Sequence, residues 1–122
     1  MNNQKYGTKF ESELKRKLLD SGLTVLSLAL PETADLIVIS NKVRILECKT
    51  VKGNRFRIKN KEQYEKLQEL AKNFSVYIVV KYHFNIGHKI IIKFYYLNHH
   101  LTFSKEEGYT LEQFIEHCKK NE

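Results

Sequence analysis

Two apolar runs separated by a short polar connection constrain the fold of this chain more than any other feature. The runs are Ala34–Ser40 and Val43–Thr50, and so little chain lies between them that they predict a β-hairpin. Asp35 opens the first run, and Glu47 and Lys49 close the second. Because side chains alternate between the two faces of a strand, Glu47 and Lys49 point the same way.

The length of the connection decides whether Asp35 meets Glu47. With a two-residue turn, Asp35 lies opposite Cys48, and the two carboxylates face opposite sides of the sheet. With a three-residue loop, Ser40–Lys42, Asp35 lies directly across from Glu47. Opposed Cβ atoms are about 4.5–5.5 Å apart, close enough for two carboxylates to share one cation. We therefore expect the three-residue loop or an equivalent bulge.

Asp35, Glu47 and Lys49 together form a candidate phosphodiester-cleaving site. The two carboxylates suit Mg²⁺, and the ammonium can activate water or stabilise developing negative charge. Taken alone, Asp35 is also explained as a turn residue at a strand edge, and Glu47 and Lys49 as a solvated strand face. Carboxylates that end an apolar face lose hydration unless they find a cation, which favours the site.

The formal net charge of +7 favours a polyanionic partner, and nucleic acid before a membrane, because no basic amphipathic helix is evident. The segment from Lys49 to Lys61 contains no acidic residue. Its remaining basic residues are Lys52, Arg55, Arg57, Lys59 and Lys61. We expect them to contact the phosphate backbone of a nucleic acid, which positions a substrate without reading its bases.

The remaining pattern predicts one α/β domain over residues 1–122, with a mixed central sheet flanked by helices in the order αβββαββα. The predicted helices are 8–20, 61–72 and 111–119; the predicted strands are 23–30, 34–40, 43–50, 75–82 and 89–97; a turn is expected at 31–33 and a short extension at 54–58. No membrane-spanning or secretory segment is evident, so we expect a cytoplasmic protein, in the host cytoplasm if a virus encodes it.

Three predicted helix starts carry the capping-box pattern, in which a cap residue is followed three positions later by Glu or Gln. The pairs are Thr8 with Glu11, Asn60 with Gln63, and Thr110 with Gln113. The pattern gives Glu11, Gln63 and Gln113 a purely structural explanation.

Histidine and cysteine provide no comparable site. The five histidines fit no zinc-binding pattern, and Cys48 and Cys118 are expected to be reduced. Cys48 alternates with Glu47 and therefore faces away from it. Tyr95 and Tyr96 are either core on one side or a dimer contact on the other, which the sequence does not separate.

Once assembled, these segments resemble the PD-(D/E)XK nuclease superfamily and, within it, the archaeal Holliday junction resolvases. The matching segments occur in order over about Lys5 to Lys81: Gly7–Glu11, Leu18–Leu23, Asp35–Ile39, Val43–Lys49, Glu62-Gln63 and Leu70–Lys72. Each segment is short, and their order and spacing carry the resemblance. Ala34 stands where the superfamily motif has proline, and Pro31 lies three positions earlier.

The resemblance implies a restriction-endonuclease-like core and a structure-selective endonuclease that uses Mg²⁺, for which Mn²⁺ substitutes. It implies that a homodimer resolves four-way DNA junctions by paired symmetric nicks, and we expect strand 90–97 and the last helix to form the dimer interface. Another branched DNA substrate, or a non-catalytic DNA-binding module of the same fold, remains an alternative.

The resemblance also implies a role for individual residues. Asp35 and Glu47 are the implied metal ligands, and Lys49 positions or activates the attacking water. Glu11 assists the metal site directly or through a water. Gln63 resembles the superfamily's helix glutamine, and Ser27 is the nearest candidate for the family's loop serine.

Overall fold

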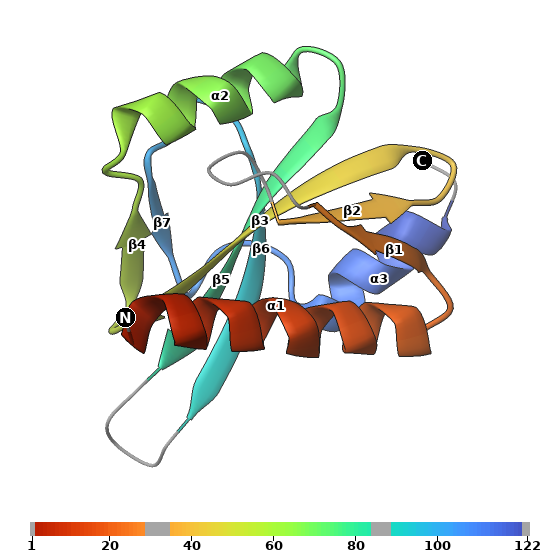
Figure 1. Ribbon diagram of the computed structural model, residues 1–122, viewed down its shortest axis with the longest axis horizontal. Coiled ribbons are helices and arrows are strands. Elements are labelled where there is room, and N and C mark those ends of the chain that lie inside the picture. The colour runs from red at the N-terminus through yellow and green to blue at the C-terminus, as the bar shows by residue number, and fades with distance from the viewer. Residues whose placement is uncertain (1, 29–34, 84–88, 121–122) are drawn as a thin grey trace.

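The computed structural model of the protein describes residues 2–28, 35–83 and 89–120, and its centre is a five-stranded mixed sheet (Figure 1). The strand order is β1-β2-β3-β5-β6, with β3 and β5 parallel and all other neighbours antiparallel. The strands are β1 (Thr24–Ser27), β2 (Leu36–Ile39), β3 (Val43–Lys52), β5 (Ser75–His83) and β6 (Ile90–Tyr96). The predicted mixed sheet is confirmed.

Helices cover both faces of this sheet (Figure 1). One face carries α1 (Asn2–Asp20) and α3 (Leu111–Lys119). The other carries α2 (Lys61–Ala71) and a two-stranded sheet formed by β4 (Arg55–Arg57) and β7 (Thr102–Ser104). No helix within the described residues is long and apolar enough to span a membrane.

The core consists of two apolar layers, one on each side of the sheet. In the first layer, α1 contributes a buried stripe of Phe10, Leu14 and Leu18, whose spacing of four residues follows one face of a helix. Phe94 of β6 stacks on Phe114 of α3 with ring centroids 4.2 Å apart. These contacts pack α1 and α3 against the same face of the sheet.

In the second layer, buried tyrosines tie the small sheet to the large one. The hydroxyl groups of Tyr82 and Tyr95 lie 2.7 Å apart, and the Tyr82 hydroxyl also donates to the Phe103 carbonyl of β7. Tyr95 is buried, whereas its neighbour Tyr96 is 53% exposed. The structure therefore assigns Tyr95 to the core and leaves Tyr96 on the surface.

The hairpin has the three-residue connection that the sequence predicts. Ile39 pairs with Val43, and the register continues to the pair Leu36 and Leu46. One step further along this register lie Asp35 and Glu47. Strand alternation places Glu47 on the sheet face that α2 covers, because Ile45, two residues before it, belongs to the second core layer. Asp35 lies directly before β2 and has the parity of Ile37, which packs against the same layer.

Several element boundaries differ from the prediction. Helix α1 begins at Asn2, so Thr8 lies inside it, and the capping box predicted for Thr8 and Glu11 is wrong. The helix ends as expected, with Gly22 at φ 97° and the Leu23 N–H donating to the Leu18 carbonyl.

The strand boundaries deviate less from the prediction. The first strand is shorter than the predicted range 23–30, and the predicted turn 31–33 lies outside the described residues, as do Ala34 and Pro31. The extension at 54–58 forms β4, and its partner β7 was not predicted.

Gly108 precedes α3, and we expect Gly108→Ala to lower the free energy of unfolding by about 3 kcal/mol or more. Its φ is +86°, and an added Cβ would lie 2.8 Å from the Phe94 carbonyl oxygen and 2.7 Å from the Tyr95 ring. Phe94 cannot move aside easily, because it exchanges two backbone hydrogen bonds of 2.8 Å with Tyr109. Urea denaturation followed by circular dichroism measures the change.

Gly53→Ala is the matched control, since Gly53 has a similar φ of +110° but no atom within 4 Å of its added Cβ. It should lose only the backbone contribution of about 1–2 kcal/mol. If both variants lost the same free energy of unfolding, the contact of residue 108 with β6 would contribute nothing to stability.

Candidate active site

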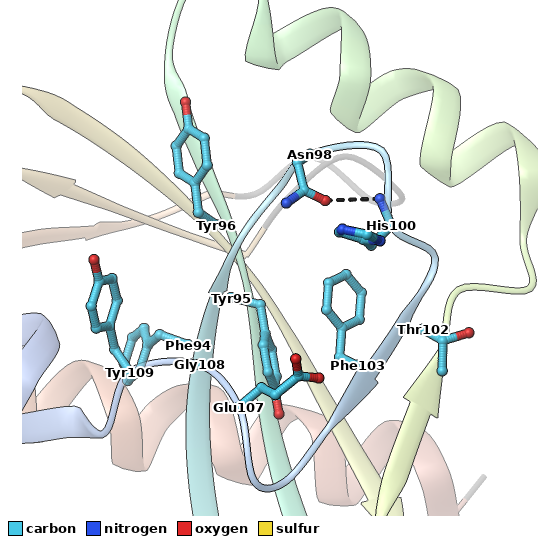
Figure 2. A pocket seen from close by; sticks show the side chains of 10 residues that line it. All are labelled: Phe94, Tyr95, Tyr96, Asn98, His100, Thr102, Phe103, Glu107, Gly108 and Tyr109. Carbon is cyan, nitrogen blue, oxygen red and sulfur yellow. Dashed lines mark hydrogen bonds between the residues drawn. The ribbon is translucent and has the colours of Figure 1, made fainter.

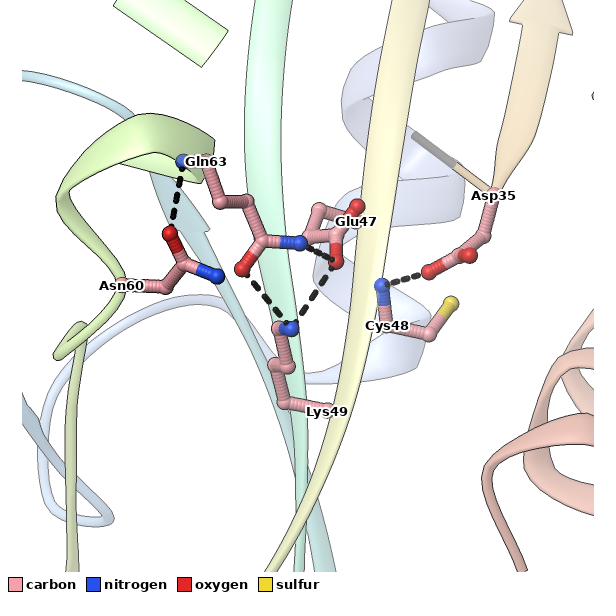
Figure 3. Close-up of polar contacts among 6 residues, drawn as sticks. All are labelled: Asp35, Glu47, Cys48, Lys49, Asn60 and Gln63. Carbon is pink, nitrogen blue, oxygen red and sulfur yellow. Dashed lines mark hydrogen bonds and ion pairs between the residues drawn. The ribbon is translucent and has the colours of Figure 1, made fainter. Parts of the chain in front are cut away.

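Glu47 occupies the middle of β3, where its carboxylate is almost fully removed from water. The side chain is 6% exposed, and its Oε2 lies 3.1 Å from Nζ of Lys49, which is 30% exposed. Both side chains project from the same strand face, as their spacing of two residues requires. The ammonium of Lys49 is thus partly exposed to water, whereas the carboxylate that it contacts is buried (Figure 3).

Gln63, at the start of α2, joins these two charged groups. Its Nε2 donates to Glu47 Oε2 at 2.7 Å, and its Oε1 accepts from Lys49 Nζ at 3.0 Å (Figure 3). The two contacts fix the orientation of the amide, because the NH₂ group faces the carboxylate and the oxygen faces the ammonium. The glutamine therefore holds the two strand residues in one arrangement.

A comparison of α2 with α3 separates the capping role of a glutamine from its role in the site. Asn60 caps α2 by accepting from the Gln63 backbone N–H at 3.1 Å, yet the Gln63 side chain turns to β3. In α3 the full capping box forms, with Gln113 Oε1 accepting from the Thr110 N–H at 2.9 Å. The capping interpretation is thus correct for Gln113 and only half correct for Gln63.

Asp35 lies just before β2 and is fixed by backbone hydrogen bonds on both sides. Its N–H donates to the Leu46 carbonyl at 2.9 Å, and its carbonyl accepts from the Leu28 N–H at 2.9 Å. Its Oδ2 accepts from the Cys48 N–H at 2.6 Å. The carboxylate thus lies against β3 at the residue that separates Glu47 from Lys49.

Glu11 of α1 completes a group of three interacting carboxyl groups. Burial raises the pKa of Glu11 to about 7, with a further contribution from a side-chain hydrogen bond to Asp35 and from its charge. Burial also raises the pKa of Glu47 to about 7, and the negative charge of Asp35 adds to this shift. Lys49 opposes both shifts but does not cancel them. Burial is the largest cause of both shifts, so both carboxyl groups lack the hydration that would stabilise their charged forms.

These donors fit a hard divalent cation that is held by one or two carboxylates. In the described part of the chain, no three His, Cys, Asp or Glu residues gather closely enough to enclose a metal ion. Mg²⁺ does not need such a cage, because it keeps several waters and takes further oxygens from substrate phosphates. Two raised carboxyl pKa values show where added positive charge would be most stabilising.

Without metal, we expect the free energy of unfolding to fall as the pH rises from about 5 to 8. The folded-state pKa of Glu47 is raised from 4.5 to about 7, so the folded protein binds this proton more tightly. The resulting destabilisation is absent below pH 4.5 and complete above pH 7. Glu47→Gln should therefore be more stable than wild type at pH 8, on the order of 1–2 kcal/mol.

Thermal denaturation in EDTA at a series of pH values measures this difference. Glu69→Gln is the control, since Glu69 forms an exposed ion pair with Lys72 and should keep the wild-type pH dependence. A Glu47→Gln variant that is no more stable than wild type at pH 8 would contradict the raised pKa of the buried Glu47 carboxyl group.

The remaining predicted residues lie on elements that are next to this group of carboxyl groups along the chain or in the sheet. The five basic residues are all exposed on the segment that leads from β3 through β4 to α2. Cys48 points into the first core layer, as predicted, and burial raises its pKa well above the ordinary value. A thiolate nucleophile is thereby disfavoured.

Ser27 lies at the end of β1, where its hydroxyl accepts from Lys15 Nζ at 2.8 Å. Lys15 was not predicted as a site residue. Its position four residues after Glu11 on the same helix was the available signal, because residues i and i+4 share a helix face.

Comparisons with known proteins address the family to which the chain belongs. Residues 2–122 match the family model described as archaeal Holliday junction resolvase (Hjc). The crossover junction endodeoxyribonuclease Hjc of Methanocaldococcus jannaschii is 39% identical over 79 residues, which are 62% of this chain. The matched region spans only 59% of that relative's length.

The 1.6 Å structure of Archaeoglobus fulgidus Hjc, a Holliday junction resolvase from an archaeal hyperthermophile, has the same fold. The TM-score is 0.71 at 15% identity, over 91% of this chain and 96% of that one. Because the family match extends over nearly the whole sequence, the chain belongs to the archaeal Holliday junction resolvase family.

Proposed function

We propose that this protein is a Mg²⁺-dependent endonuclease that cuts four-way DNA junctions. The single observation that carries the proposal is the buried Glu47 carboxylate, bound to both Lys49 and Gln63 and electrostatically coupled to Asp35. A solvated strand face would not hold an ammonium and an amide on one buried oxygen. Family membership and the relatives named as junction resolvases support the substrate.

The proposed chemistry is hydrolysis of a phosphodiester bond by in-line attack of water. A Mg²⁺ ion held here would polarise the scissile phosphate and lower the pKa of a bound water, and Mn²⁺ would substitute for it. Asp35 and Glu47 provide the anionic ligands, and Glu11 supports them directly or through a water. Lys49 stabilises the nucleophile or the negative charge that develops on the phosphate.

Gln63 positions Glu47 and Lys49, and we expect Gln63→Ala to slow cleavage by about 10–100-fold, as for other outer-shell partners of metal ligands. The substitution leaves the cap of α2 intact, because that hydrogen bond uses the Gln63 backbone. Single-turnover cleavage at saturating protein measures the effect. Gln113→Ala is the matched control, since it removes only a capping contact of α3 and should leave the rate unchanged.

The basic residues between β3 and α2 are proposed to hold the DNA backbone. They are Lys52, Arg55, Arg57, Lys59 and Lys61. They follow the site residue Lys49 directly along the chain and end at the helix that carries Gln63, so bound backbone would lead into the site. This contact is independent of base sequence, as recognition of a branched shape requires.

Paired nicks require two sites, and each chain provides one, so we propose a twofold homodimer. The outer edge of β6 and the adjoining α3 are the proposed interface. Ile90 and Tyr96, at the two ends of β6, are 54% and 53% exposed. Burial of these apolar side chains would favour association.

Cleavage of a synthetic four-way junction with Mg²⁺, beside a Y-fork and a linear duplex, tests the function. We expect symmetric nicks in the junction and a dimeric mass by sedimentation equilibrium. Equal cleavage of the fork would identify a nuclease for another branched structure. Binding without cleavage in either Mg²⁺ or Mn²⁺ would identify a binding module of the same fold.

A further inference from the structure

A hollow of about 310 Å³ lies between α1 and the end of the edge strand β1. We call it the α1–β1 hollow, and Glu11, Lys15, Arg16 and Ser27 are the lining residues that matter here. Three of these residues come from one side of α1, next to its buried stripe, and the hollow begins at Glu11. It therefore adjoins the candidate active site but extends away from the basic segment between β3 and α2.

A separate hollow lies over the outer face of β6, lined by Tyr96, His100 and Tyr109 among others, and nothing in it points to a ligand (Figure 2).

Among the described residues, Lys15 has no ion-pair partner and places its positive charge over the α1–β1 hollow. Its Nζ donates to the Ser27 hydroxyl at 2.8 Å. On the other side of α1, by contrast, Lys81 is paired with Glu13 at 3.3 Å. A hydroxyl group orients an ammonium without cancelling its charge, so Lys15 keeps its full attraction for an anion.

The remaining charges around the hollow do not occupy it. Arg16 is exposed at the rim and adds a second cation. The Glu11 carboxyl group is engaged with Asp35. Asp20, the last residue of α1, lies one helical turn beyond Arg16 and forms no ion pair with either cation. An anion would therefore bind at the Lys15 end of the hollow.

Lys15 follows Glu11 by one turn of α1, an axial distance of about 5.4–6 Å. This distance is on the scale that separates successive phosphates of a DNA strand. We propose that the α1–β1 hollow binds the backbone phosphate next to the scissile phosphate on the cleaved strand, with Lys15 as its principal contact. The proposal rests on the nuclease function proposed above, and it makes Lys15 a positioning residue on the opposite side of the site from the basic segment.

A combined protein and DNA substitution experiment tests this contact. Lys15→Ala is compared with Lys17→Ala, which removes the same charge from the same helix at a residue that lines a different hollow. Each protein is assayed with junctions carrying a neutral methylphosphonate on either side of the mapped cleavage position. Binding in Ca²⁺ and single-turnover cleavage in Mg²⁺ are both measured.

We expect Lys15→Ala to weaken binding about tenfold and to lower the slope of log K against log salt by about 0.9. One methylphosphonate should weaken wild type and Lys17→Ala, yet have almost no further effect on Lys15→Ala, which identifies a shared contact. Lys15→Arg should restore most of the binding. Identical behaviour of Lys15→Ala and Lys17→Ala, or additive effects with every methylphosphonate, would overturn the inference.

The failure of this inference is distinguishable from failure of the proposed function. If wild type cleaves the junction and Lys15→Ala behaves as Lys17→Ala does, only the phosphate contact is wrong. If wild type binds but never cleaves, the nuclease function is wrong, and the salt dependence of the variants still decides whether Lys15 contacts the backbone. A wild-type protein that binds no branched DNA overturns both.

Discussion

Asp35→Asn and Glu47→Gln are each expected to reduce cleavage of a four-way junction on the order of 10³-fold. Both substitutions keep the shape of the side chain and remove an anionic oxygen donor. An asparagine at position 35 can still accept the 2.6 Å hydrogen bond from the Cys48 N–H, and a glutamine at position 47 can still accept from Gln63. The fold should therefore survive while the metal loses a ligand.

A measurement of junction binding distinguishes a loss of cleavage from a loss of the folded structure. In EDTA both variants should bind a junction at least as tightly as wild type, because a negative charge beside a phosphate is removed. Glu69→Gln, which changes a carboxylate of an exposed ion pair, should retain wild-type cleavage. If Asp35→Asn cleaves normally, then Asp35 is only a turn residue, which is the alternative that its position in the sequence left open.

The relation of Asp35 to Glu47 could be predicted because strand alternation leaves few choices. The number of residues in the hairpin connection determines whether the two carboxylates share a face, and the observed pair Ile39 and Val43 is the one that unites them. The same reasoning correctly placed Cys48 in the core. Strand alternation depends only on the local backbone, so the sheet face that it assigns to each residue is the same in the folded protein.

Features that depend on distant contacts could not be predicted in this way. Strand β7 has three residues and exists because it pairs with β4, far away in the sequence. Arg44 lies in a strand yet is 1% exposed, with its guanidinium donating to the Ser40 hydroxyl at 2.9 Å. The direction of the Gln63 side chain likewise depends on Glu47, and the cap pattern alone gave no sign of it.

Lys49→Met is the second substitution for which we expect a large effect, a decrease in single-turnover cleavage of about 10²–10³-fold. Methionine keeps most of the apolar stem but removes the ammonium that lies 3.1 Å from Glu47 and 3.0 Å from Gln63. Two properties are lost together, stabilisation of the charge developing on the phosphate and partial neutralisation of Glu47. Binding of a junction should decrease far less, because at most one phosphate contact disappears.

A matched pair of variants separates these two effects of Lys49. Lys72→Met removes the cation of the exposed pair with Glu69 and should leave cleavage unchanged. In the double variant Lys49→Met with Glu47→Gln, the buried negative charge is also gone, so metal-free stability should return to the Glu47→Gln value while cleavage stays lost. If the ammonium only balanced Glu47, saturating Mg²⁺ would restore cleavage to Lys49→Met, because the metal ion would replace that charge. Persistent loss at saturating Mg²⁺ would instead place the ammonium in the reaction itself.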